Sequence, residues 1–124
     1  STASIRDRIN LVGHKSGAQL KKLYSDAVAT IIPSYYEGFS YPLVESMKMG
    51  CPVLTSSLGV MKDVGGEGAH LVNPKDPEQI MAGMERLFAD RVYKDKLLVA
   101  AKEITQSMSW LNCAKQISQI YGSL

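Results

Sequence analysis

Short apolar runs alternate with helix-like segments over the first two thirds of this chain of 124 residues. Val28 to Ile32 and Pro52 to Thr55 are the clearest runs, and we also expect short strands at Ile9 to Val12 and His70 to Val72. A continuous apolar run of this length is typical of a strand that is covered on both faces. Because strands separated by helices are joined by right-handed crossovers, the alternation predicts an α/β fold with a parallel sheet and flanking helices.

The segments between these strands have helical patterns or turn residues. We expect a helix from about Gly17 to Ser25 and a second from about Tyr41 to Met49. The second stops at Gly50, since glycine readily adopts the left-handed conformation that ends a helix. Ser56 to Gly59 is interpreted as a loop and Gly65 to Gly68 as a flexible turn, which lacks the lysine of a phosphate-binding P-loop.

The last third of the chain predicts consecutive helices. The first begins at Asp76, an N-cap acid followed by proline at the first helical position. Its expected apolar face consists of Ile80, Met84, Leu87 and Phe88. A second helix is expected from about Val92 to Ser107, and Ser109 is expected to cap a third. Since no linker or repeat interrupts the pattern, residues 1–124 are interpreted as one domain that ends in helices.

The composition is that of a globular domain and argues against several classes of function. The net charge of +2 does not indicate a nucleic-acid partner. No apolar run reaches the ~18–20 residues that a membrane span needs. Cys51 and Cys113 have no spacing that suggests a disulfide or a metal site, so we expect reduced thiols in a cytoplasmic protein and no metal.

Two carboxylates, Glu37 and Glu45, lie eight positions apart on either side of a bend that contains Gly38 and Pro42. The bend joins an expected strand to an expected helix, which is where open α/β sheets bind ligands. Backbone N–H groups at a helix start can hold a phosphate, and nearby acids can bind hydroxyl groups, so the pattern indicates a nucleotide sugar. On spacing alone the alternative stays open that Glu37 is a solvated loop residue and Glu45 a helix-stabilising acid.

The complete string of residues is more specific than the spacing. Glu-Gly-Phe-Ser-Tyr-Pro-Leu-Val-Glu-Ser-Met at 37–47, followed by Gly-Cys-Pro-Val at 50–53, resembles the E-x7-E signature of retaining glycosyltransferases of family 4 (glycosyl transferases group 1). The resemblance covers nearly the whole chain. The sequence departs from the family pattern at Ser40, where a second glycine is usual. The resemblance implies a Rossmann-like domain, the C-terminal half of a GT-B fold, and the chain would be a fragment of that nucleotide-sugar-binding domain.

The resemblance also implies roles for the matching residues. Glu45 matches the second acid of the motif, which binds the ribose hydroxyls of the donor; a carboxylate suits a vicinal diol because it accepts charge-assisted hydrogen bonds. Glu37 matches the first acid, near the donor sugar and the reacting centre, and is the expected catalytic residue. Further donor-binding residues are expected at Gly38, Phe39, Ser40 and Tyr41, mainly through backbone N–H groups, and at Gly13 and His14 near the base. Core packing for Phe39 and an exposed loop histidine at position 14 are the alternatives.

The reaction implied by the resemblance needs neither a metal nor a cofactor. A sugar would pass with retention from a UDP-, GDP- or ADP-linked donor to a sugar, lipid or glycan acceptor, in a front-face displacement. In the family, a basic segment ahead of the first expected strand stabilises the diphosphate, and an N-terminal domain binds the acceptor. Nothing in this chain matches either part, so we expect the isolated chain to be inactive. The full-length protein is expected in the cytoplasm or at the inner face of a membrane.

Two alternatives remain open at this point. The same fold could belong to a nucleotide-sugar epimerase or a phosphorylase-like enzyme, although the compact signature favours a transferase. A non-catalytic α/β interaction domain would keep the scaffold, but the presence of both Glu37 and Glu45 counts against a loss of chemistry. No Gly-x-Gly-x-x-Gly follows an expected strand, which argues against a nicotinamide or flavin dehydrogenase.

Overall fold

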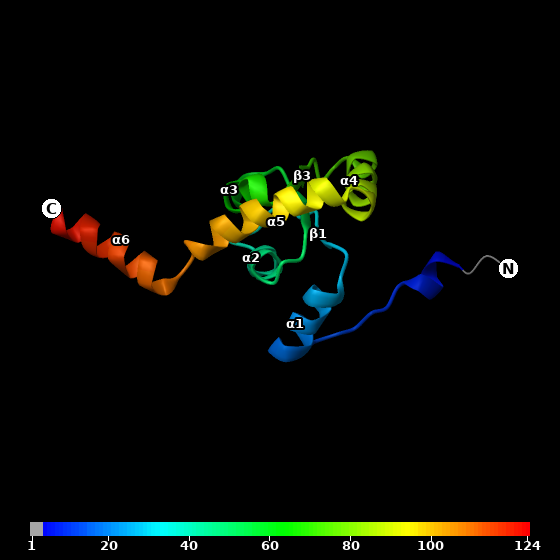
Figure 1. Cartoon of the computed structure of the whole chain (residues 1–124), viewed down its shortest axis with the longest axis horizontal. Coiled ribbons are helices and arrows are strands. Elements are labelled where there is room, and N and C mark those ends of the chain that lie inside the picture. Colours follow the sequence, from blue (N-terminus) through cyan, green and yellow to red (C-terminus); the bar gives the residue numbers. More distant parts are fainter. Residues whose placement is uncertain (1–3) are drawn as a thin grey trace.

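A parallel sheet lies at the centre of the computed structural model, which describes residues 4–124 (Figure 1). Its strands, in spatial order, are β1 (Thr30–Ile32), β2 (Val53–Ser56) and β3 (His70–Val72). In the register of the sheet, Leu54 lies beside Ile31 on one side and His70 on the other. The predicted α/β fold, with a parallel sheet and flanking helices, is therefore confirmed.

The helices of the described residues follow the predicted order closely. They are η1 (Ile5–Arg8), α1 (Gly17–Asp26), α2 (Tyr41–Lys48), α3 (Gly59–Gly65), η2 (Gly66–Gly68), α4 (Pro77–Ala89), α5 (Arg91–Gln106) and α6 (Trp110–Gly122). Helix α3, which was not predicted, begins at the end of the expected loop and includes Gly65, and the 3₁₀ turn η2 takes up Gly66–Gly68; the interpretation of Gly65 to Gly68 as a flexible turn is therefore wrong. The segment is short and rich in glycine, and tertiary contacts rather than propensity hold it in helical form.

The predicted strand at Ile9 to Val12 is also wrong. These residues pair with no described strand, and the side chain of Leu11 is 96% exposed. A strand forms only where a neighbour satisfies its N–H and C=O groups, and no such neighbour lies beside this segment in residues 4–124. For the same reason β1, the edge of the described sheet, is only half-buried instead of covered on both faces, whereas every residue of β2 is buried.

Two apolar clusters hold the helices to the sheet. On one side, α2 and α5 pack on β2 through Leu43, Met47, Val53 and Ala101. On the other, α4 and α5 cover the sheet through Leu54, Val72, Leu87 and Leu97. Helix α4 approaches closely because residue 83 is glycine: a Cβ there would lie 2.6 Å from Leu54 Cδ1 and 2.7 Å from the His70 ring. The sheet is thus enclosed by helices on both faces, and α2 is fixed on one of them.

Helix caps form where the sequence predicts them. The Asp76 carboxylate accepts hydrogen bonds from the N–H groups of Glu78 and Gln79 at the start of α4. The Ser109 hydroxyl accepts from the N–H of Asn112 at the start of α6. Such caps satisfy donors that have no partner inside the helix.

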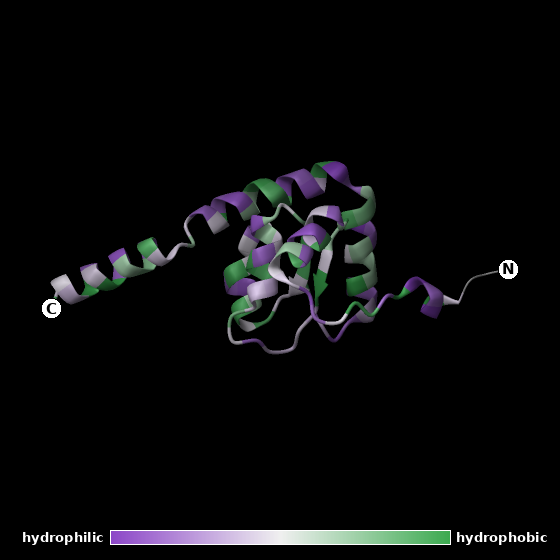
Figure 2. Ribbon diagram, turned by 90° about the horizontal axis from the view of Figure 1, so that it is seen from below, coloured by the Kyte–Doolittle hydropathy of each residue, from purple (hydrophilic) through white to green (hydrophobic). Residues whose placement is uncertain are grey.

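Helix α6 and the N-terminal segment extend away from the body in opposite directions (Figures 1 and 2). Helix α6 has no buried residue, and its apolar side chains, including Trp110, Ile120 and Tyr121, are exposed. Among residues 4–124, no helix has both the length and the apolar character that crossing a bilayer requires.

Candidate functional site

The loop after β1 enters α2 through a strained residue. Ser40 has φ 67° and ψ 74°, the left-handed region that non-glycine residues rarely adopt. This conformation turns its carbonyl toward the helix, where it accepts hydrogen bonds from the N–H groups of Leu43 and Val44. The glycine that is usual at this position of the signature therefore has a physical basis, since glycine adopts positive φ without the steric cost of a Cβ atom.

The start of α2 presents hydrogen-bond donors without partners. Within residues 4–124, the N–H groups of residues 38–41 donate no hydrogen bond. The side-chain oxygen of Ser40, which is 5% exposed, also lacks a partner among the described residues. Other buried hydroxyl groups nearby are satisfied: Ser46 donates to Thr30 Oγ1, and Thr55 donates to the Ile32 carbonyl. Free N–H groups at a helix N-terminus form a site for an anion.

Glu45 lies on the second turn of α2 and is half-buried. Its Oε2 accepts a hydrogen bond of 3.2 Å from the hydroxyl of Tyr24, the buried residue of α1. Burial, together with the charge of Glu45, raises the pKa of Tyr24 above its ordinary value. The phenol therefore remains a donor at neutral pH, and it holds the carboxylate of Glu45 in a defined position.

Glu37 is a half-buried member of the loop between β1 and α2. Its Oε1 accepts a hydrogen bond of 3.0 Å from the hydroxyl of Ser34, the residue that follows Pro33 at the end of the β1 segment. This short-range bond reduces the freedom of the Glu37 side chain. The second oxygen of the carboxylate has no partner among the described residues.

Two hollows flank Glu45. The smaller, of about 210 Å³, lies between α1 and α2 and is lined by Lys21, Tyr24, Glu45 and Lys48 among others. The larger, of about 690 Å³, lies between α2 and the junction of α5 with α6. Lys48 lines both hollows and donates a 3.5 Å hydrogen bond to the carbonyl of Met108 at that junction. Glu45 and Lys48 thus line open space on both sides of α2.

The family of the chain is shown by its similarity to known sequences. Residues 1–107 match the family model described as glycosyl transferases group 1. The chain belongs to this glycosyltransferase family. An uncharacterized glycosyltransferase of Methanocaldococcus jannaschii is 33% identical over 94% of the chain and 31% of its own length. The MMP alpha-(1->4)-mannosyltransferase of Mycolicibacterium hassiacum is 32% identical over 94% of the chain and 29% of its own length.

The fold comparison agrees with the sequence comparison. Sucrose-phosphate synthase from Thermosynechococcus elongatus superposes with a TM-score of 0.81 at 31% identity, over 94% of this chain and 30% of that chain. The fold of this chain is therefore the predicted one, a Rossmann-like domain of the GT-B type. The O-antigen chain mannosyltransferase B of Escherichia coli, 28% identical, is likewise covered over 30% of its length. The chain spans about 30% of the length of these relatives.

The structure brings some of the sequence-predicted residues together and leaves others apart. Phe39, Tyr41 and Glu45 line the larger hollow, and the rings of Phe39 and Tyr41 are in edge contact with centroids 5.3 Å apart. Gly13, with φ 62°, and His14 are exposed and line neither hollow. Their predicted contact with the base, like the other predicted roles, stays a prediction.

Sequence reasoning missed several residues beside Glu45. Tyr24 was expected on a helix but not as a partner of this acid, and Lys21 and Lys48 had no motif to mark them. Lys48 follows Glu45 by three positions, a spacing that places both on one side of a helix and so offered a signal. Trp110 lies 65 positions from Glu45 in the sequence, and nothing in the local pattern connects the two.

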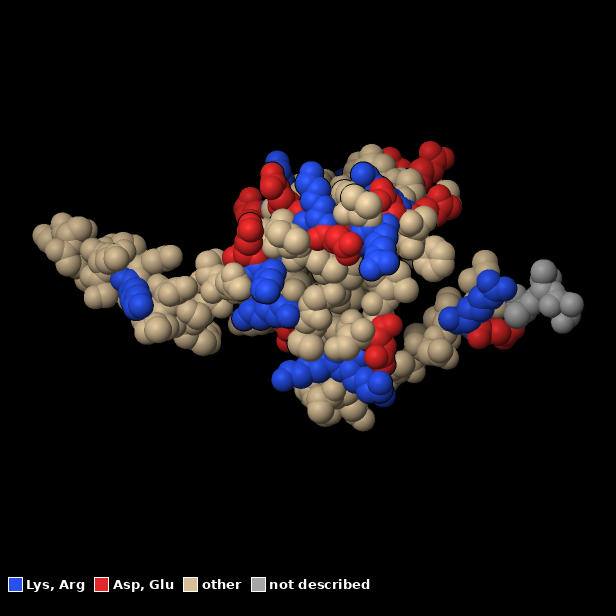
Figure 3. All heavy atoms as spheres, in the orientation of Figure 1, with Lys and Arg blue, Asp and Glu red and all other residues tan. Residues whose placement is uncertain are grey.

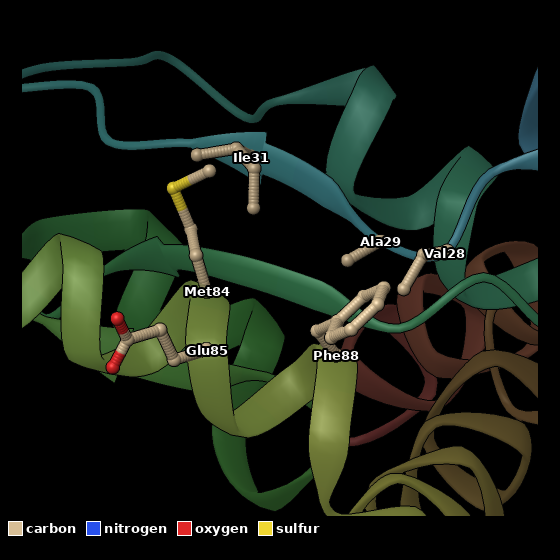
Figure 4. A pocket seen from close by; sticks show the side chains of 6 residues that line it. All are labelled: Val28, Ala29, Ile31, Met84, Glu85 and Phe88. Carbon is tan, nitrogen blue, oxygen red and sulfur yellow. The ribbon is translucent and has the colours of Figure 1, made fainter.

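A third hollow lies between β1 and α4 (Figure 4), on the face of the sheet that α2 does not cover. It has a volume of about 380 Å³ and runs beside β1 and α4, where Met84 points toward Ile31 and Phe88 toward Val28. The Glu85 carboxylate points away from it, so its lining is apolar. None of the sequence-predicted site residues lies there, and among residues 4–124 no group of three or more His, Cys, Asp or Glu side chains could hold a metal ion.

Proposed function

We propose that this chain forms part of the donor site of a retaining glycosyltransferase of family 4, which transfers a sugar from a nucleotide sugar to an acceptor. The chain is then a piece of the C-terminal domain of a two-domain GT-B enzyme. The family match and the relatives support sugar transfer. The observation that carries the assignment to this surface is the row of free N–H groups at residues 38–41 beside Glu45.

The donor diphosphate would bind at the start of α2. The N–H groups of Gly38, Phe39, Ser40 and Tyr41 have no partner among the described residues, and the positive end of the helix dipole favours an anion. These groups supply hydrogen bonds to the charge that develops on the leaving diphosphate, which is the main task of the protein in a displacement without a protein nucleophile.

Glu45 would bind the ribose of the donor. One carboxylate oxygen accepts the Tyr24 hydrogen bond, and the remaining acceptor capacity faces the hollow between α1 and α2. Two adjacent hydroxyl groups can donate to it, and charge-assisted hydrogen bonds of this kind are about twice as strong as neutral ones. Lys21 and Lys48 line the same hollow, and their positive charges suit a negatively charged ligand.

Glu37 would contact the transferred sugar. Its carboxylate is oriented by Ser34 and precedes the free N–H groups by one residue. A negative charge in this position can accept hydrogen bonds from sugar hydroxyls and stabilise positive charge at the reacting carbon. The proposal includes no metal ion. The domain that binds the acceptor and the remaining cationic groups would come from the rest of the enzyme, acting in the cytoplasm or at the inner face of a membrane.

Binding of nucleoside diphosphates tests the proposal. We expect UDP, GDP or ADP to bind the chain in isothermal titration calorimetry. Glu45→Gln should weaken that binding roughly ten- to a hundredfold, since a charge-assisted hydrogen bond is worth ~1.5–3 kcal/mol. Glu85→Gln is the matched control, because Glu85 is an acid of similar type on α4, away from α2. Equal affinity in the Glu45→Gln variant and the original chain would contradict the proposal.

A further inference from the structure

Each acid of the signature accepts a hydrogen bond from a hydroxyl group that lies outside the signature. Glu45 Oε2 accepts from Tyr24, which belongs to α1 and lies 21 positions earlier in the sequence. Glu37 Oε1 accepts from Ser34, which follows β1 directly after Pro33, over 3.0 Å. The two acids are therefore held by different elements, and either hydroxyl can be removed without changing the other contact.

Ser34 is connected to the sheet by a short and rigid path. The Ile32 carbonyl, at the end of β1, accepts a 3.0 Å hydrogen bond from Oγ1 of Thr55, a fully buried residue of β2. Pro33 comes next, and its ring fixes the backbone φ angle ahead of Ser34. Ser34 and Glu37 are both half-buried, so water competes less for their hydrogen bond than it would at the surface. The Glu37 carboxylate is therefore held relative to the sheet, although it belongs to a loop.

The hydrogen bond from Ser34 orders Glu37 and still leaves it able to bind a ligand. One carboxylate oxygen accepts from Ser34, and the other has no partner among the described residues. A flexible glutamate loses rotamer freedom when a ligand orders it, and that loss is smaller if the side chain is already held. The second oxygen is thus positioned in advance for a hydroxyl group of the transferred sugar.

The nucleotide would bind to groups that do not depend on Ser34. In the proposed function these are the N–H groups of residues 38–41 for the diphosphate and the Glu45 carboxylate for the ribose. Figure 3 shows basic side chains gathered over α1, and Lys21 of this helix lines the hollow beside Glu45. Loss of the Ser34 hydroxyl should therefore affect the sugar and spare the nucleotide.

We propose that Ser34 is a positioning residue, which holds the Glu37 carboxylate for contact with the transferred sugar. The inference rests on the proposed function and adds to it a residue that acts only through Glu37. Ser34 supplies neither charge nor a proton to the reaction. Its contribution is to keep the acid in place before the donor arrives, so that less ordering is needed on binding.

The test compares each nucleoside diphosphate with its sugar conjugate. Isothermal titration calorimetry gives the affinities of the chain for UDP and UDP-glucose, GDP and GDP-mannose, and ADP and ADP-glucose. Ser34→Ala should leave the affinity for the diphosphate unchanged and weaken binding of the sugar conjugate roughly two- to tenfold, the size of one hydrogen-bond contribution. Ser34→Thr keeps a hydroxyl and should restore this affinity. Ser123→Ala is the matched control, since it removes a hydroxyl that bonds the Ile120 carbonyl at the end of α6.

A double-mutant cycle distinguishes positioning from a general effect on the fold. In a Glu37→Ala background, Ser34→Ala should cause no further loss of affinity for the sugar conjugate, because no carboxylate is left to position. An equal loss in the presence and absence of the Glu37 carboxylate would overturn the inference.

The nucleoside diphosphates separate this inference from the proposed function. If none of the three binds the original chain, the donor site fails, and the role of Ser34 fails with it. If one binds but no sugar conjugate does, the donor site stands and the positioning role is wrong. The same conclusion follows if Ser34→Ala weakens the diphosphate and its sugar conjugate equally, or weakens neither.

Discussion

Replacement of Ser40 by glycine should stabilise the fold, and the structure allows the size of the effect to be worked out. The left-handed backbone of Ser40 costs ~1–2 kcal/mol of steric strain, which glycine avoids. Its buried hydroxyl without a partner costs roughly 1–3 kcal/mol. These gains are partly offset, because glycine makes the unfolded chain more flexible and so lowers the free energy of unfolding by ~0.5–1 kcal/mol. The net expectation for Ser40→Gly is a gain of about 1–4 kcal/mol in the free energy of unfolding.

Ser40→Ala is the matched control, because it removes the hydroxyl but keeps the strained Cβ. It should gain less than glycine by about 0–1.5 kcal/mol, because alanine retains the ~1–2 kcal/mol of left-handed strain but does not add the ~0.5–1 kcal/mol entropic cost of glycine. Urea denaturation followed by circular dichroism measures both variants, and 1 kcal/mol corresponds to roughly 3–6 °C in Tm for a domain of this size. If Ser40→Gly unfolds at the same or a lower urea concentration than the original chain, the account of the strained loop is wrong.

Three further predictions concern the sheet and the site. Gly83→Ala should destabilise the fold by ~1–3 kcal/mol in urea denaturation, because its Cβ would lie 2.6 Å from Leu54 Cδ1. Unchanged stability would contradict the close packing of α4. Burial, and then the charge of Arg86, lower the pKa of His70, so protonation of this histidine favours the unfolded chain. The free energy of unfolding should therefore be constant above the unfolded pKa of ~6.5 and fall as the pH drops below it. His70→Gln should reduce the slope of this fall. Tyr24→Phe should weaken nucleoside diphosphate binding in calorimetry, by less than Glu45→Gln does, since it frees the carboxylate without removing its charge; a loss larger than that of Glu45→Gln would give Tyr24 a different role.

Local sequence patterns predict those elements of the fold that depend on interactions between residues close together in the sequence. The apolar runs at β2 and β3, the glycine that ends α2 at Gly50 with φ 70°, and the Asp76 cap of α4 depend on neighbouring residues. The error at Ile9 to Val12 has the opposite cause. Its residues are apolar and suited to a strand, but a strand requires a partner, and sequence patterns do not show whether one lies beside it.

The candidate site also contains residues that the sequence predicts and residues that it does not. The signature between Glu37 and Glu45 could be recognised because its acids, its glycine and the helix start lie within nine consecutive residues. The contact of Tyr24 with Glu45 and the position of Trp110 beside the same helix depend on how α1 and α6 meet α2. Long-range contacts of this kind leave no periodic signal in a single sequence. The left-handed conformation of Ser40 was similarly hidden, because serine does not mark a positive φ as glycine does.

A backbone NMR titration of the chain with UDP, GDP and ADP in turn tests the central claim most directly. The account predicts that one of these nucleotides shifts the amide signals of residues 38–41, whose N–H groups are free, and those around Glu45. Signals on the far side of the sheet, such as that of Phe88, should not move. A folded chain whose residues 38–45 remain unchanged with all three nucleotides would contradict a donor site at the start of α2.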